Sequence, residues 1–312
     1  MASLPRERLA LCQPPFTNTG VDYFGPISVK RGRVTEKRWG CIFTCLTTRA
    51  VHLEVAGDLS TDSFIIALRR FHGKRGNRKT IRSDNGTNFV GANRELGEAL
   101  KSLSQERITG ELAQENIAWY FNPPSSPHMG GIFESMVKQV KRAMKTVVND
   151  QVLPEETLHT VLFETEAIVN SRPLTPVSDD PNNYETLTPT HFLIGRASPN
   201  TPPGRVEERE INSRKRWRMA QALADMMWRR WRKEYLPTLT MRSKWNKEQR
   251  NLKEGDLILL KTDDALRSHW SLGRILKTIP GRDGRVRMAE VKTPSGTLMR
   301  PAAKLCMLEE SV

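Results

Sequence analysis

The sequence is poor in several features that define whole classes of protein. Its 312 residues include only four cysteines, which excludes a small scaffold held together by disulfides. No apolar run approaches the roughly 18 residues that a membrane span needs, and the first residues lack the apolar stretch of a signal peptide. Acidic residues number 35 against 49 basic ones, which gives a formal net charge of +14. We therefore expect an intracellular protein whose partner is a polyanion, DNA or RNA rather than a membrane.

The basic charge is concentrated near the C-terminus. Residues 211–312 contain 23 basic and 11 acidic side chains and five of the seven tryptophans. A segment rich in proline and glycine, 198–204, precedes this region and is typical of a linker. We predict a core domain over 12–197, a linker over 198–210, a basic helical segment over 211–250 and a small barrel over 251–310.

The first two thirds of the chain show the pattern of an α/β domain. Runs rich in β-branched and aromatic residues predict strands over 19–29, 38–47, 50–56, 79–84 and 117–121. Helical periodicity predicts helices from Ser60 to about residue 70 and over 91–104, 132–148 and 155–170, with a loop over 122–131. This order predicts a mixed sheet that begins with an antiparallel meander and is flanked by helices.

The last hundred residues combine one helix with short strands. A helix is predicted over 214–235, and one of its faces carries Trp217, Ala220, Ala224, Met227, Trp231 and Tyr235. The tryptophans keep helical spacing, which favours a core role over base stacking. Short strands separated by glycine, aspartate and proline follow from residue 255 and predict a small SH3-like barrel.

Three acids stand at positions that suit metal binding. Asp22 lies within a predicted strand among apolar residues, Asp84 ends another strand, and Glu134 follows Gly130-Gly131 in the predicted first turn of a helix. Carboxylates that converge from separate elements are what two-metal phosphoryl transfer requires. Simpler roles remain open for each of them: an ion pair with an arginine for Asp22, a turn for Asp84 and a helix cap for Glu134.

Taken in order, three motifs resemble the catalytic core of retroviral-type integrases. These are GVDYFGP, SDNGTNF and NPPSSPHMGGIFE, and the details look most similar to integrases of BEL/Pao-type LTR retrotransposons. Supporting stretches are TRAVHLE at 48–54, NSRPLTP at 170–176 and LTPTHFLIG at 187–195. The resemblance implies an RNase H-like fold in which Asp22, Asp84 and Glu134 bind two Mg²⁺ ions, with Mn²⁺ as a substitute. It also implies DNA 3′-end processing and strand transfer.

Candidate DNA contacts lie near these acids and in the basic C-terminal region. Near the acids they are Lys138, Lys141 and Lys145 on the face of Glu134, with Asn85, Asn88 and His128 in adjoining loops. In the C-terminal region they are Arg214, Lys215 and Arg216 on the helix and Arg274 and Arg285 in the barrel. The alternative for each cluster is an ordinary solvated face.

Two departures from the family pattern keep other functions open. The 49 residues between Asp84 and Glu134 exceed the retroviral spacing, which fits a retrotransposon branch. Cys12, Cys41, Cys45 and Cys306 do not form the His/Cys zinc pattern of an integrase N-terminal domain, so no zinc site is expected. The first hypothesis is an active nuclear integrase with a cytoplasmic pre-integration phase, which acts on double-stranded DNA as a homo-oligomer. The alternatives are a catalytically idle DNA-binding remnant and, on fold grounds alone, a ribonuclease H.

Overall fold

The computed structural model describes most of the chain in two compact units. The described residues are 13–76, 79–83, 118–121, 127–148, 151–177, 185–197, 206–239, 250–262 and 265–309. Unit 1 comprises residues 1–169 and 206–227, and unit 2 comprises residues 170–205 and 228–312. The predicted domain boundaries remain predictions. In the described part of the chain, no helix is sufficiently long and apolar to span a membrane.

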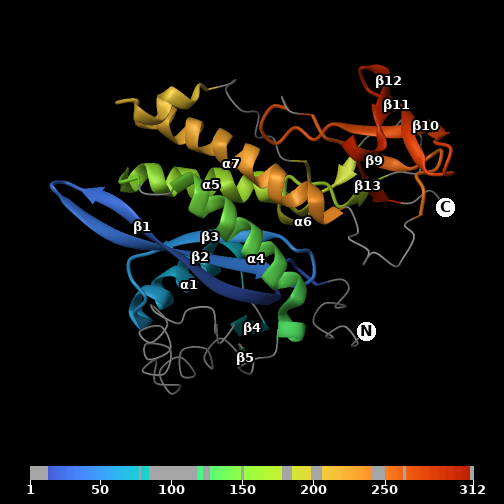
Figure 1. Ribbon diagram of the computed structural model, residues 1–312. Helices are drawn as coiled ribbons and strands as arrows, with labels where there is room; N and C mark the ends of the chain where they lie inside the picture. The colour runs from blue at the N-terminus through green and yellow to red at the C-terminus, as the bar shows by residue number, and fades with distance from the viewer. Residues whose placement is uncertain are drawn as a thin grey trace. The chain divides into compact units, whose positions relative to one another are not determined.

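Unit 1 is built on a mixed sheet (Figure 1). Its strands are β1 (Asn18–Arg31), β2 (Val34–Cys45), β3 (Val51–Ala56), β4 (Thr80–Ser83) and β5 (Ala118–Phe121), in the order β3-β2-β1-β4-β5. The first three form an antiparallel meander, and β4 and β5 join in parallel. The short β6 (Leu153–Pro154) also pairs with β1 in parallel. The predicted meander and mixed sheet are confirmed.

Unit 1 also contains helices. They are α1 (Thr61–Arg75), α4 (Pro127–Val148), α5 (Glu155–Asn170), the 3-10 turn η2 (Glu208–Asn212) and the first part of α7 (Arg216–Leu239). Of these, α1 and α4 pack directly on the sheet. Ser60 caps α1 because its side chain accepts a hydrogen bond from the Ser63 amide. Phe64 and Phe71 of α1 are buried, as are Val140 and Met144 of α4. The helices predicted from Ser60 to about residue 70, over 132–148 and over 155–170 are confirmed, and the helix predicted over 91–104 lies outside the described residues.

The start of α4 differs from the sequence prediction. The predicted loop over 122–131 is wrong for its last five residues, because the helix already begins at Pro127. Proline is compatible with the first turn of a helix, since the first amides have no partner within the helix. Glu134 therefore lies seven residues into α4 and not in its first turn, which contains no acid. A helix-capping role for Glu134 is thereby excluded.

Unit 2 contains an all-antiparallel sheet with its own core. The strands are β9 (Leu257–Leu260), β10 (Leu272–Pro280), β11 (Val286–Thr293), β12 (Gly296–Pro301) and β13 (Leu305–Glu309), with the 3-10 turn η3 (Ala302–Lys304), in the order β12-β11-β10-β9-β13. Shorter elements are β7 (Thr175–Pro176), β8 (Thr186–Leu187) and α6 (Pro189–Ile194). Ile258, Ile275, Val291 and Leu305 pack together in the core. The predicted set of five short strands is confirmed.

The second part of α7 contributes an aromatic cluster to unit 2. Trp228 contacts Trp270 with ring centroids 4.8 Å apart, and Trp231 stacks on Tyr235 at 5.5 Å. Trp231 is buried, which confirms its predicted core role, and Trp228, for which no role was predicted, is buried as well. Trp217 is 54% exposed, so its predicted place in the core is wrong.

Candidate functional site

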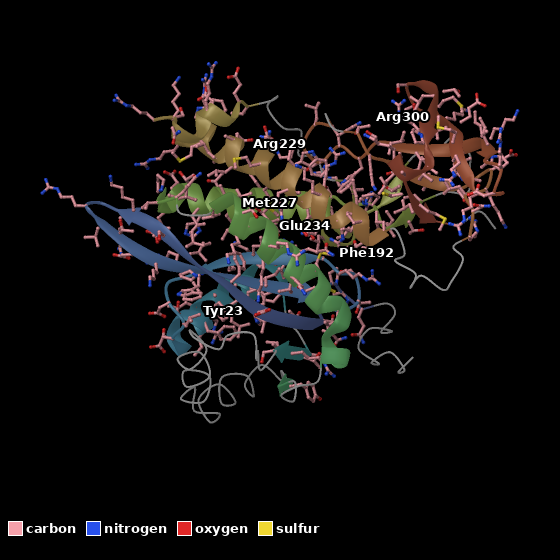
Figure 2. The ribbon with its side chains drawn as sticks, in the orientation of Figure 1. Tyr23, Phe192, Met227, Arg229, Glu234 and Arg300 are labelled. Atoms are coloured by element: carbon pink, nitrogen blue, oxygen red, sulfur yellow. The ribbon has the colours of Figure 1, made fainter. Side chains whose placement is uncertain are left out.

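Asp22 is an acid in the middle of the central strand β1. Successive side chains of a strand point to opposite faces of the sheet. The Tyr23 ring, labelled in Figure 2, contacts Phe64 of α1 with centroids 6.1 Å apart. Asp22 faces α4 on the other side of the sheet. Asp22 Oδ1 accepts a hydrogen bond from the Tyr23 amide at 2.7 Å, and Oδ2 lies 2.6 Å from Lys141 Nζ. The open question of an ion-pair partner for Asp22 is thus answered by a lysine.

The ion pair between Asp22 and Lys141 joins α4 to the sheet. Their side chains are 20% and 26% exposed, so the contact is only partly screened by water. A half-buried carboxylate on a central strand requires such a cation, because burying it unpaired would be costly. The pair therefore fixes Lys141 of α4 against the strand that carries the candidate metal ligand.

The lysine stripe on α4 is split by this contact. Lys138 and Lys145 are exposed, whereas Lys141 is half-buried against Asp22. Arg142 is exposed on the same helix and was missed by the sequence analysis. The signal was present, because Arg142 stands four residues after Lys138 and thus close to it on the helix surface. The exposed basic surface of α4 accordingly consists of Lys138, Arg142 and Lys145.

The register of the sheet bears on the second acid. Strands β1 and β4 are parallel, and Val21 pairs with Ser83, the last residue of β4. Asp22 directly follows Val21 in the sequence, and Asp84 directly follows Ser83. Asp84, Asn85 and Asn88 themselves lie outside the described residues.

The backbone of α4 carries the third acid. Glu134 precedes Lys141 by seven residues, close to two helical turns, so the two positions lie on the same side of the helix. His128 belongs to the first turn of α4 and not to a loop. The side chains of Glu134 and His128 lie outside the described residues.

The described residues supply part of what a divalent metal would need. Asp22 offers a carboxylate, the hard oxygen ligand that Mg²⁺ prefers. Among residues whose side chains are described, no group of three or more His, Cys, Asp or Glu side chains is arranged to hold a metal ion. The described part of the site therefore fits one ligand of such an ion.

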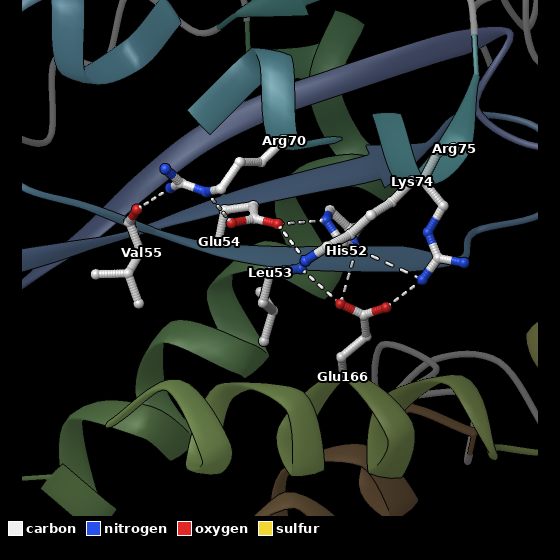
Figure 3. Close-up of polar contacts among 8 residues, drawn as sticks. All are labelled: His52, Leu53, Glu54, Val55, Arg70, Lys74, Arg75 and Glu166. Atoms are coloured by element: carbon white, nitrogen blue, oxygen red, sulfur yellow. Dashed lines mark hydrogen bonds and ion pairs between the residues drawn. The ribbon is translucent and has the colours of Figure 1, made fainter. Parts of the chain in front are cut away.

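A second group of acids lies at β3, the edge strand of the same sheet (Figure 3). All six residues of β3 are buried. Glu54 accepts from Arg70 Nε at 2.7 Å and from Lys74 Nζ at 2.8 Å, both on α1. Glu166 reaches β3 from α5 and pairs with Arg75.

His52 links these two acids. Its Nε2 lies 3.1 Å from Glu54 Oε1, and its Nδ1 lies 2.9 Å from Glu166 Oε2. The ring also stacks on Phe71 of α1 with centroids 5.2 Å apart. His52 therefore bridges the carboxylates that approach from its own strand and from α5.

The same group closes the edge of the sheet. Glu166 Oε2 accepts a hydrogen bond from the Leu53 amide at 2.9 Å, and Arg70 donates to the Val55 carbonyl. These backbone groups would otherwise be available to pair with another strand. All four carboxylate oxygens of Glu54 and Glu166 have donors, which indicates a structural role for the cluster.

The pKa values of the two acids agree with this role. Burial alone would raise the pKa of Glu54, but hydrogen bonds from His52, Lys74 and Arg70 outweigh it and hold the pKa at about 2. Burial also opposes ionisation of Glu166, yet His52 and Arg75 lower its pKa. The sequence analysis did not single out these residues. The available signal was two polar positions, His52 and Glu54, in an otherwise apolar strand.

The predicted DNA contacts at the start of α7 lie on the surface. Arg214, Lys215 and Arg216 are exposed, and Arg216 Nη1 lies 2.9 Å from Glu156 Oε2 of α5. Both side chains of that pair are mostly in water, so the interaction is weak. A phosphate can compete with such a partner.

The later basic cluster on α7, residues 229–233, is partly structural. Arg230 Nη2 lies 2.5 Å from Glu234 Oε1, and buried Arg232 donates to the Thr262 carbonyl. Arg229 and Lys233 are exposed (Figure 2 labels Arg229 and Glu234). The cluster thus divides between the surface and the interior of unit 2.

The predicted barrel contacts have two different environments. Arg274 on β10 is half-buried, and its Nη1 donates to the Gly255 carbonyl at 3.2 Å. Arg285 is exposed in the turn before β11, where its amide donates to Asp283 Oδ1 at 3.2 Å. Arg285 is therefore the better placed of the two for a contact with phosphate.

Comparisons with known proteins assign only part of the chain to a family. Residues 215–308 match a family model described as a family of unknown function, DUF5641. A search of curated proteins finds no match. A chain of the simian T-cell lymphotropic virus intasome, solved in complex with the PP2A regulatory subunit B56 gamma, matches with a TM-score of 0.38 and 12% identity. That match covers 100% of this chain and 85% of the intasome chain. At a TM-score of 0.38 it establishes neither the fold nor the function of this chain.

Proposed function

We propose that this protein is an integrase-type polynucleotidyl transferase of retroelement origin, which processes DNA 3′ ends and joins them to target DNA. The single observation that carries the proposal is the position of Asp22, an acid in the middle of the central strand β1 on the face that packs against α4. The mixed sheet flanked by helices supports an RNase H-like assignment, and the antiparallel sheet of unit 2 supports an SH3-like one.

The proposed catalytic set is Asp22, Asp84 and Glu134. The register of β1 and β4 supports the first two, and the position of Glu134 on the Lys141 side of α4 supports the third. Two Mg²⁺ ions, or Mn²⁺ in their place, would activate the attacking oxygen and stabilise the leaving oxygen. In the proposed reaction, a water or a DNA 3′-hydroxyl forms a bond to phosphorus while a phosphodiester bond breaks and leaves a 3′-hydroxyl.

The exposed cations are proposed to hold the DNA. Lys138, Arg142 and Lys145 form a basic surface on the same helix as Glu134, and each phosphate that they neutralise makes binding more dependent on salt. Arg214, Lys215, Arg216 and Arg285 add exposed positive charge elsewhere on the chain. We propose double-stranded DNA as the partner, a homo-oligomer as the working form and the nucleus as the place of action.

A second candidate function is DNA binding without catalysis. The contact between Asp22 and Lys141 favours it, because an ion pair that anchors a helix gives the acid a structural reason to be present. The two functions share the basic surfaces and differ only in whether the three acids support a reaction.

The reverse of strand transfer tests these proposals. The full chain would be incubated with a branched DNA that mimics a strand-transfer product, in Mg²⁺ and in Mn²⁺. We expect the parent to reseal the branch, and Asp22→Asn, Asp84→Asn or Glu134→Gln to slow resealing about a hundredfold or more. Asp62→Asn, which changes an exposed acid on α1, is the matched control and should remain active. Folded, DNA-binding parent protein that yields no product would reject catalysis and leave the binding function.

A further inference from the structure

Trp217 is a large aromatic side chain that the fold leaves in water. It is the second residue of α7 and is 54% exposed. Of the five tryptophans whose side chains the structure describes, Trp228 and Trp231 are buried and Trp39 and Trp270 are half-buried. An indole with more than half of its surface in water adds little to the stability of the core. Its exposure therefore calls for an explanation outside the packing of the unit.

Positive charge surrounds this indole. The segment from Ser213 to Met219 contains four cations and no acid: Arg214, Lys215, Arg216 and Arg218. The guanidinium of Arg218 lies over the Trp217 ring at 5.5 Å from its centroid. Among these side chains, those of Arg214, Lys215 and Arg216 are exposed.

Two acids near this segment pair with its arginines, one at the surface and one in a partly buried contact. Glu156 lies 2.9 Å from Arg216 with side chains 75% and 65% exposed, and Glu210 lies 3.1 Å from Arg218 with 26% and 42%. The exposed pair of Arg216 with Glu156 contributes little, since water and salt screen it. A phosphate oxygen can replace Glu156 on Arg216 without leaving a buried charge behind.

We propose that Trp217 is a stacking platform for an unpaired base, with Arg214, Lys215 and Arg216 on the phosphates that flank it. Bases of a duplex hide their faces in the stack, whereas an unpaired base presents a face that an exposed aromatic ring can cover. Cations beside an aromatic ring are the combination that single-stranded nucleic acid requires. The site would thus favour an overhang or frayed end over a blunt duplex.

The inference rests on the proposed nucleic-acid function but not on catalysis. It predicts which feature of DNA the protein recognises. If the parent chain binds DNA but Asp22→Asn reseals the branched DNA as fast as the parent, the catalytic proposal fails. The stacking proposal for Trp217 is unaffected by that result. If the parent binds no nucleic acid at all, both fail.

Fluorescence anisotropy with three labelled probes tests the site in the full chain. The probes are a single-stranded oligonucleotide, a blunt duplex and the same duplex with an overhang at one end. We expect Trp217→Ala to weaken binding of the single strand and the overhang by about five- to a hundredfold, and binding of the blunt duplex by less than about twofold. Trp217→Phe should keep most of the affinity because it retains an aromatic face.

Matched variants separate stacking from charge and from general loss of apolar surface. Phe192→Ala removes another exposed aromatic, 42% exposed on α6, and should leave all three probes unaffected. Changing Arg214, Lys215 and Arg216 together to alanine should lower the single-strand salt slope by about two units. Trp217→Ala should leave that slope unchanged.

Two results would overturn the proposal. One is equal binding of all three probes by Trp217→Ala and the parent. The other is a loss by Trp217→Ala that is as large on the blunt duplex as on the overhang. A change of oligomeric state in Trp217→Ala without a change in probe binding would instead assign the exposed indole to a protein contact.

Discussion

Two segments, one at the start of α7 and one within it, have nearly the same composition and opposite environments. Residues 214–218 read Arg-Lys-Arg-Trp-Arg and residues 229–233 read Arg-Arg-Trp-Arg-Lys. In the first segment Trp217 is exposed, Arg216 pairs with the exposed Glu156, and Arg218 pairs with the partly buried Glu210. In the second, Trp231 is completely buried and Arg232 donates to a backbone carbonyl from the interior of unit 2. Similar sequences therefore form part of the protein surface in one segment and part of the core in the other.

Helical periodicity cannot explain this difference. Trp217 and Trp231 are 14 residues apart, which places them within about 40° of each other around the helix axis. Periodicity determines which residues share a face, but burial depends on what packs against that face at each point along the helix. Trp231 stacks on Tyr235, and Tyr235 in turn contacts Trp270, 35 residues further along the chain. Contacts between such distant residues cannot be read from the local pattern.

The largest expected effect compares the two tryptophans directly. Trp231→Ala removes a completely buried indole and should lower the free energy of unfolding by about 3–5 kcal/mol. Trp217→Ala removes an exposed one and should change it by less than about 0.5 kcal/mol. Urea denaturation followed by circular dichroism measures both. Equal destabilisation by the two variants would show that the contrast between the segments is false.

The two arginines give a smaller effect in the same direction. Arg232→Met removes a buried donor to the Thr262 carbonyl and a guanidinium 5.4 Å from the Trp228 ring centroid. We expect a loss of about 1–3 kcal/mol in the free energy of unfolding, because the carbonyl is left without that donor. Arg216→Met breaks only the exposed pair with Glu156 and should cost at most about 0.5 kcal/mol. The same denaturation experiment should rank Arg232→Met well below Arg216→Met in stability.

Much of the architecture could be predicted from the sequence, because it is encoded locally. The strands β1, β2 and β3 follow from runs of β-branched and aromatic residues, and α5 was predicted with its observed bounds. The start of α4 was missed, because a segment with three prolines before Met129 is typical of a loop, although a proline can begin a helix.

The candidate site could be predicted only as a set of anomalies. Asp22 was found because it is charged among apolar residues of a strand, and the same anomaly marks His52 and Glu54. The partners could not be predicted, because Lys141 is 119 residues from Asp22 and Glu166 is 113 residues from Leu53. Whether an isolated charge serves a site or a structural cluster depends on these distant partners.

The contrast between the enclosed Glu54 and exposed acids also predicts that stability depends on pH. Near neutral pH we expect this to be the smallest of the effects. The pKa of Glu54 in the folded protein is lowered from 4.5 to about 2. A lowered pKa means that the unfolded chain binds the proton more readily, so the contribution of Glu54 to stability is fully present above about pH 4.5. It is lost progressively as the pH falls from about 4.5 to 2. Urea denaturation midpoints measured between pH 7 and pH 2.5 should therefore stay level at first and then decrease.

Glu156→Gln, which changes an exposed acid, should keep this profile, whereas Glu54→Gln should be less stable at pH 7 and show a shallower decrease below pH 4.5. A Glu54→Gln profile parallel to that of the parent would show that the enclosed carboxylate does not control acid stability.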